Sequence, residues 1–146
     1  MSNSNNRILK LFKSRKTVID LLRTQGFNVS DYEDFNINEI DAMYSKKQLD
    51  LKFTNQETKK NVYVKYFLDT KQIKPNTLDN IIEDLYEIEN ILQKDDTLVI
   101  IIDDEPNDTI INKIKFLYDK DGIFVVIHNI QRLQFNILNH NLVPSM

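Results

Sequence analysis

Cysteine is absent from this 146-residue sequence. Without cysteine the chain can form neither a disulfide bond nor a thiolate metal site, and this composition fits a reducing compartment. Glycine is scarce as well, since Gly26 and Gly122 are the only two. The chain therefore offers no glycine-rich loop of the kind that cradles a nucleotide phosphate. No apolar run is long enough to cross a bilayer, so we expect a nuclear or cytoplasmic protein with no membrane partner.

The sequence also lacks a large excess of positive or negative charge. Lysine and arginine number 19 and aspartate and glutamate 22, which gives a formal net charge of -3 with neutral histidines. This total predicts no strong preference for polyanions or polycations. Hydrophobic residues make up 41% and charged residues 28%, as in an ordinary soluble globular protein. We expect one domain with a substantial buried core.

The order of apolar patterns predicts an α/β domain, in which a mixed sheet is flanked by helices. Apolar residues recur at helical spacing from Arg7 to Gln25, where Gly26 is placed to end the helix. Residues 36–47 show a weaker pattern of the same kind. Alternation over residues 48–54 and 61–68 predicts two strands that form an antiparallel hairpin.

The second half of the chain predicts a strand–helix–strand unit. Residues 98–102 form a continuous apolar run, which is typical of a strand buried on both faces, and residues 123–127 form another. A helix is expected between them over residues 109–118, so the two strands should be parallel. Ahead of this unit, Thr77 is a suitable N-cap for a helix that runs to about Lys94.

Arg15 is the most informative single residue. A helix turns by about 100° per residue, which places Arg15 on the apolar side of the first helix, between Leu11 and Val18. An isolated buried charge is very costly. The guanidinium must therefore pair with an acidic residue of this domain or face a partner chain, and the sequence leaves both interpretations open.

Basic residues crowd the remaining faces of the same helix. Residues 7–23 carry six basic groups against one acid, Asp20. These groups could steer the phosphates of a nucleic acid, or they could form an ordinary solvated face. Interleaved aromatic residues for base stacking are absent. The basic residues other than Arg15 are Arg7, Lys10, Lys13, Lys16 and Arg23.

An acidic segment, residues 103–108, follows the expected strand 98–102. Its carboxylates could hold Mg²⁺ beyond the carboxyl end of that strand. Alternatively the segment is a solvated loop in which Asn107 or Asp108 caps the next helix. No matching histidine, lysine or second acidic cluster accompanies it, so neither a metal nor another cofactor is predicted.

A metal-dependent nuclease is one alternative function. Endonuclease-like sites need an acid and then an acid-x-Lys sequence on the next strand, which together hold a metal and activate water. Tyr63-Val64-Lys65 has a tyrosine in place of the second acid. Asp50-Leu51-Lys52 supplies an acid-x-Lys sequence, but its upstream acid, Asp41, lies on a weak helix. The constellation is incomplete, and we see no nucleophilic triad.

Two segments resemble parts of one protein family. The first is Leu11-Phe12-Lys13-Ser14-Arg15-Lys16-Thr17-Val18 with the later turn Gly26-Phe27-Asn28-Val29. The second is Phe135-Asn136-Ile137-Leu138-Asn139-His140-Asn141-Leu142-Val143-Pro144. They resemble the opening helix and turn of eukaryotic RNA polymerase subunit five, which the nuclear polymerases share, and that family's Leu-x-x-Asn-Ile-x-x-His-x-Leu-Val-Pro signature. Residues 62–67, 71–74 and 98–102 match the family less specifically.

The resemblance implies a non-catalytic subunit of a DNA-directed RNA polymerase. The family's N-terminal domain has a restriction-endonuclease-like fold without the catalytic residues. It forms part of the lower jaw of the cleft, beside downstream duplex DNA, and leans on the largest subunit; no small-molecule substrate is implied. By this resemblance we expect Arg15, Lys16, Phe135, His140, Leu142 and Pro144 to contact the largest subunit, and Lys71, Lys74 and Pro106 to lie near DNA.

The family continues past this motif into a smaller C-terminal domain that contacts the polymerase body. We therefore expect residues 1–142 to be the N-terminal jaw domain, and residues 143–146 to begin the linker to a C-terminal assembly domain missing from this chain. The composition, rich in Asn, Ile, Lys and Asp, suits a large DNA virus with its own transcription machinery. The location would then be the virion and the host cytoplasm. A stand-alone protein-interaction module is the remaining alternative function.

Overall fold

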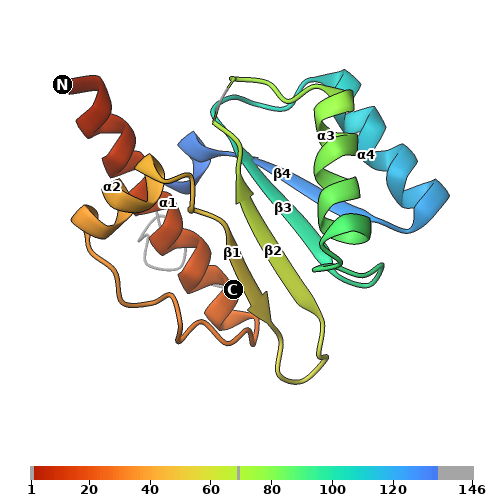
Figure 1. Ribbon diagram of the computed structural model, residues 1–146, viewed down its shortest axis with the longest axis horizontal. Helices are drawn as coiled ribbons and strands as arrows, with labels where there is room; N and C mark the ends of the chain where they lie inside the picture. The colour runs from red at the N-terminus through yellow and green to blue at the C-terminus, as the bar shows by residue number, and fades with distance from the viewer. Residues whose placement is uncertain (1, 69, 135–146) are drawn as a thin grey trace, which may run out of the picture.

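Two pairs of helices cover the opposite faces of one central sheet (Figure 1). The computed structural model describes residues 2–68 and 70–134. The predicted class, an α/β domain with a mixed sheet flanked by helices, is confirmed. One face carries α1 (Ser2–Thr24) and α2 (Ile37–Ser45), and the other carries α3 (Pro75–Ile82) and α4 (Asp108–Asp121). The strands are β1 (Leu51–Thr54), β2 (Asn61–Tyr66), β3 (Thr97–Ile102) and β4 (Phe124–Asn129).

The strands pair in the order β1-β2-β3-β4. β1 and β2 form the predicted antiparallel hairpin, with Leu51 opposite Val64. β3 runs parallel to β2 and to β4, so the parallel pair predicted from the strand–helix–strand unit is also confirmed. The C-terminal ends of β2, β3 and β4 and the N-terminal end of β1 consequently meet at one end of the sheet, which we call the carboxyl end.

The core consists of two apolar clusters, one on each face of the sheet. Leu98, Ile100 and Ile102 of β3 pack toward α3 and α4, whereas Ile101 packs toward α1. All four side chains are fully buried. Because successive side chains of a strand point to opposite faces, residues 98–102 present apolar side chains to both faces of the sheet. Burial of each side chain stabilises the fold by about 1.5–3 kcal/mol.

Gly26 ends α1, as predicted. Its φ of +92° lies in the left-handed region, which residues with a side chain rarely adopt. The backbone N–H of Phe27 donates to the carbonyl oxygen of Leu22 at 3.0 Å and closes the last turn. Phe27 then bridges to Asn55, so the turn connects the helix to the β1–β2 hairpin.

The first two helices begin near the predicted residues. α1 starts at Ser2 rather than at Arg7, since residues 2–6 include neither proline nor glycine. α2 starts after Asn36, whose Oδ1 accepts from the backbone N–H of Glu39 at 2.9 Å. The Glu39 carboxylate in turn accepts from the Asn36 backbone N–H at 3.2 Å. This capping box stabilises a short helix with weak apolar periodicity.

The prediction that Thr77 caps the third helix is wrong. Lys74 is the N-cap, and Pro75 occupies the first helical position. Proline suits that position because its missing N–H would have no partner there and its φ is already helical. After α3 the chain continues as a π-helical turn, η1 (Glu83–Ile88). A π turn departs from the 3.6-residue repeat, and Ile88 at its end is 68% exposed.

The prediction that residues 123–127 form a strand buried on both faces is also wrong. β4 lies at the end of the strand order, and β3 is its neighbour in the part of the chain that the structure describes. Val125 is buried, but Phe124 is 47% exposed and His128 is exposed. The apolar run alone could not distinguish an edge strand from a central one.

Candidate functional site

Arg15 lies inside the domain, with 4% of its surface exposed. Its Nη1 donates to the carbonyl oxygen of Leu49 at 3.2 Å. The central guanidinium carbon lies 5.8 Å from the ring centre of Tyr32 and 5.4 Å from that of Phe35. No ion pair joins Arg15 to a carboxylate of the described residues. The domain itself holds this side chain, but two ring faces and a carbonyl oxygen replace the acidic partner that one interpretation required.

The burial of Arg15 has an electrostatic cost. Loss of hydration lowers the pKa of Arg15 from its usual value, and electrostatic interactions with Tyr66, Tyr32 and Glu39 act in the opposite direction. A guanidinium nevertheless stays protonated in proteins, so the side chain carries its charge into the core. To contact another chain, the guanidinium would have to leave these rings.

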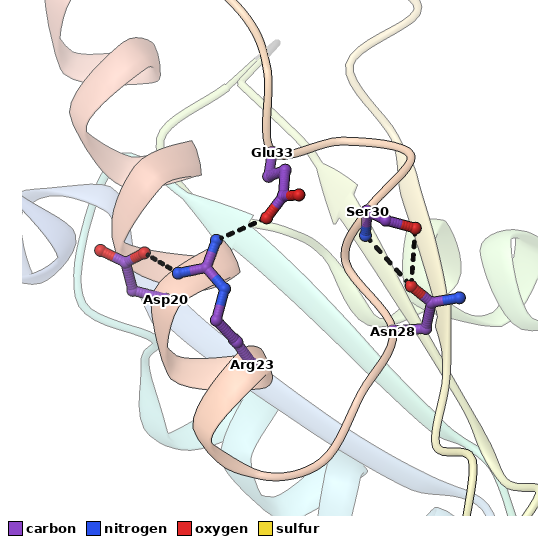
Figure 2. A network of polar contacts seen from close by, with 5 residues as sticks. All are labelled: Asp20, Arg23, Asn28, Ser30 and Glu33. Atoms are coloured by element: carbon purple, nitrogen blue, oxygen red, sulfur yellow. Dashed lines mark hydrogen bonds and ion pairs between the residues drawn. The ribbon is translucent and has the colours of Figure 1, made fainter.

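A charged network ties the end of α1 to the loop that follows it (Figure 2). Arg23 lies between two carboxylates, because Nη1 donates to Asp20 at 2.9 Å and Nη2 donates to Glu33 at 3.0 Å. In the same loop, Oδ1 of Asn28 accepts from the backbone N–H of Ser30 at 3.1 Å and from its hydroxyl at 2.8 Å. The bond to Glu33 is the main cause that raises the pKa of Arg23. The two carboxylates thus neutralise the charge of Arg23, so Arg23 is a poor candidate for steering the phosphates of a nucleic acid.

The other polar residues of the N-terminal motif divide between interior and surface. Ser14 is fully buried; its Oγ donates to the Leu11 carbonyl oxygen at 2.9 Å and lies 3.0 Å from the Tyr66 hydroxyl, to which it is hydrogen-bonded. Lys16 is exposed. Of the two motif residues predicted to contact the largest subunit, Lys16 presents its side chain at the surface and Arg15 does not.

Three basic residues of α1 line a cleft of about 500 Å³ at the carboxyl end of the sheet. Arg7 is held there, since its Nη1 donates to the Tyr44 hydroxyl at 3.2 Å. Segments that follow three different strands meet α1 here, and this could not be predicted from the sequence because such contacts depend on sheet order. The cleft is lined by Arg7, Leu9, Lys10, Lys13, Leu68, Asp103, Ile130 and Gln134.

The segments that carry the predicted DNA-proximal residues lie side by side at the same end. Gln72 joins them: its Nε2 donates to the carbonyl oxygen of Glu105 at 2.5 Å, and its Oε1 accepts from the Asn107 backbone N–H at 3.3 Å. Lys71 and Lys74 are exposed, and Pro106 is half-buried. Their proximity to DNA stays a prediction.

The acidic loop is largely occupied by contacts within the domain. Glu105 accepts from Nε of Arg132 at 2.6 Å and from Asn129 at 2.8 Å, and the Arg132 bond is the main cause that lowers the pKa of Glu105. Asn107 caps α4, because its Oδ1 accepts from the Ile110 backbone N–H at 3.0 Å. Within residues 2–68 and 70–134, no group of three or more His, Asp or Glu side chains is placed to hold a metal ion.

A pairing that sequence reasoning missed lies at the start of the hairpin. Asp50 accepts from the Tyr63 hydroxyl at 2.8 Å and from Nζ of Lys65 at 3.4 Å. Burial, and then the charge of Asp50, raise the pKa of Tyr63 above its usual value. The hairpin register could have revealed this cluster, since Leu51 opposite Val64 sets Asp50 opposite Lys65. Tyr63 stands where a nuclease would need its second carboxylate.

Four residues predicted to contact the largest subunit lie outside the described residues. They are Phe135, His140, Leu142 and Pro144.

No protein-family model matches the chain, and no curated protein matches it. The fold itself defines the class, a mixed α/β domain with a four-stranded sheet in the described part. None of its described helices combines the length and the apolar character needed to cross a membrane.

Proposed function

We propose that this chain is a non-catalytic subunit of a DNA-directed RNA polymerase, and that it forms part of a jaw beside downstream duplex DNA. The observation that carries the proposal is that residues of the family-like motif occupy structural positions in the fold. Arg15 is buried against aromatic rings, Gly26 has a positive φ, and Val29 is buried in the core. The matched positions are thus the ones that fix α1 and its turn, as expected for a shared fold.

The cluster at the start of the hairpin supports the restriction-endonuclease-like part of the proposal. Asp50 at the start of β1 and Lys65 on β2 meet as the acid and the lysine of such nucleases do, with Tyr63 in place of the second acid. Asp84 and Glu89 line the same small cavity, but no group of three or more acidic or histidine side chains among the described residues is placed to hold a metal ion. This arrangement favours a passive relative of the nucleases over the alternative of an active enzyme.

Affinity purification tests the proposal. A tagged copy of the full chain, expressed in its native cells, should recover the largest polymerase subunit. Lys16→Glu should lower that recovery several-fold, because Lys16 is the exposed motif residue that is predicted to contact the largest subunit. Lys115→Glu is the matched control, since Lys115 is exposed on α4, on the opposite face of the sheet.

Two results would contradict the proposal. One is a tagged chain that recovers no polymerase subunit; a defined complex with another protein would then favour a stand-alone interaction module. The other is cleavage of duplex DNA by the purified chain with Mg²⁺, abolished by Asp50→Ala, which would establish the nuclease alternative.

A further inference from the structure

We propose that the cleft lined by Arg7, Lys10 and Lys13, here called the basic cleft, binds the phosphate backbone of duplex DNA. The inference rests on the proposed function, which puts downstream DNA beside this domain. It adds the face of the domain that meets the DNA.

The charges of the basic cleft do not cancel among the described residues. Arg7, Lys10 and Lys13 bring three positive charges, whereas Asp103 is the one carboxylate in the lining. Neither Lys10 nor Lys13 forms an ion pair in the part of the chain that the structure describes. Since like charges in one cleft repel each other, an anion that bridges them is favoured.

The spacing of the cations suits an extended polyanion. Residues three apart on a helix are separated by about 4.5 Å along the axis, so the row from residue 7 to residue 13 covers about 9 Å. One DNA strand carries a phosphate about every 3.4 Å along the duplex axis, so the row spans more than one phosphate. Arg7 is fixed in place by Tyr44, through a hydrogen bond of 3.2 Å and a ring contact of 6.0 Å.

Two other basic residues near the carboxyl end interact with acids. Arg132 pairs with Glu105 at 2.6 Å. Lys71 interacts electrostatically with Asp104, whose pKa is lowered mainly by a hydrogen bond from Gln72 and in smaller part by Lys71. The loop that contains Pro106 therefore presents carboxylates next to Lys71 and Arg132. The basic cleft is the better binding surface for phosphate.

Fluorescence anisotropy of a labelled duplex of random sequence tests the inference with the full chain at low salt. Lys10→Gln/Lys13→Gln should weaken binding about tenfold and reduce the slope of log K against log salt by about 1.8, because two phosphate contacts are lost. Lys60→Gln/Lys94→Gln is the control, since these exposed residues precede β2 and β3 at the opposite end of the sheet. It removes the same charge and should bind nearly as the unmodified chain does. Thermal unfolding should be unchanged in both variants.

Three results would overturn the inference. Equal weakening by the two double variants would mean that total charge alone governs binding. Absence of duplex binding by the unmodified chain would show that the basic cleft is not a DNA site. The proposed function would still stand if the tagged chain recovered the largest polymerase subunit. Polyglutamate serves as a second probe. If Lys10→Gln/Lys13→Gln weakened binding of polyglutamate but left duplex binding unaffected, the basic cleft would bind an acidic partner segment instead of DNA.

Discussion

Arg15 carries a full charge into the core and forms no ion pair among the described residues. Each ring contact contributes about 0.5–2 kcal/mol, and the bond to the Leu49 carbonyl contributes about 1.5–3 kcal/mol. Against this, Nε has no partner within the described ranges, and burial removes the hydration of the charge. These effects are of similar size, so the packing of the long side chain should matter more than its charge.

A substitution series at Arg15 tests this balance. Arg15→Met keeps the length and removes the charge, so the free energy of unfolding should change by less than about 1 kcal/mol. Arg15→Lys loses the planar group that stacks on Tyr32 and Phe35 and should cost about 1–2 kcal/mol. Arg15→Ala leaves a cavity and should cost about 3 kcal/mol. Urea denaturation measures all three, and a greater loss for methionine than for lysine would reveal an acidic partner.

Tyr66 predicts how stability depends on alkaline pH. Burial raises the pKa of Tyr66 from its usual value of 10.0 to about 12. Above pH 10 the unfolded chain releases this proton while the folded chain keeps it, so the free energy of unfolding should fall as pH rises from about 10 to about 12. Tyr66→Phe should reduce that fall. Urea titrations at several pH values measure it; an unchanged slope in Tyr66→Phe would mean that other groups cause the whole effect.

The residue scale also shows what could be predicted from sequence. The burial of Arg15 followed from the helical repeat, because that geometry is local. Its partners did not, since Tyr32 and Phe35 lie in a loop without a periodic pattern that would define its path. The Asp50–Lys65 pair was predictable in principle from the hairpin register.

At the scale of helices and strands, predictions were correct where an element is decided by its own residues. The helix predicted over residues 36–47 and the buried strand predicted over residues 98–102 are examples. Predictions were wrong where an element depends on residues outside the pattern that was used to predict it. Thr77 was a plausible cap, but the helix starts earlier because Pro75 occupies the first helical position. The exposure of Phe124 follows from the place of β4 at the end of the strand order among the described residues, which depends on sheet topology.

The two glycines give a matched test at this scale. Gly26 and Gly122 both have positive φ, +92° and +70°. A Cβ at Gly26 would also lie 3.4 Å from the Asn55 side chain, whereas a Cβ at Gly122 would meet nothing within 4 Å. Gly26→Ala should therefore lower the free energy of unfolding by about 2 kcal/mol and Gly122→Ala by about 1 kcal/mol. Chemical denaturation compares them, and the reverse order would contradict the role of the Gly26 turn.

At the scale of the whole molecule, the parallel strands gather the candidate contacts at one end. The basic cleft, the acidic loop and the Asp50–Lys65 pair all lie at the carboxyl end of the sheet. The α/β class was predictable from the order of patterns, but this gathering required the sheet topology. The proposed contact with DNA uses the basic cleft at this end.

Membership of a polymerase is the central claim, and purification through the largest polymerase subunit of the same cells tests it most directly. Quantitative mass spectrometry of the purified enzyme should find this chain in a constant ratio to the largest subunit, unchanged after washing at high salt. An active polymerase that contains none of it would contradict the account.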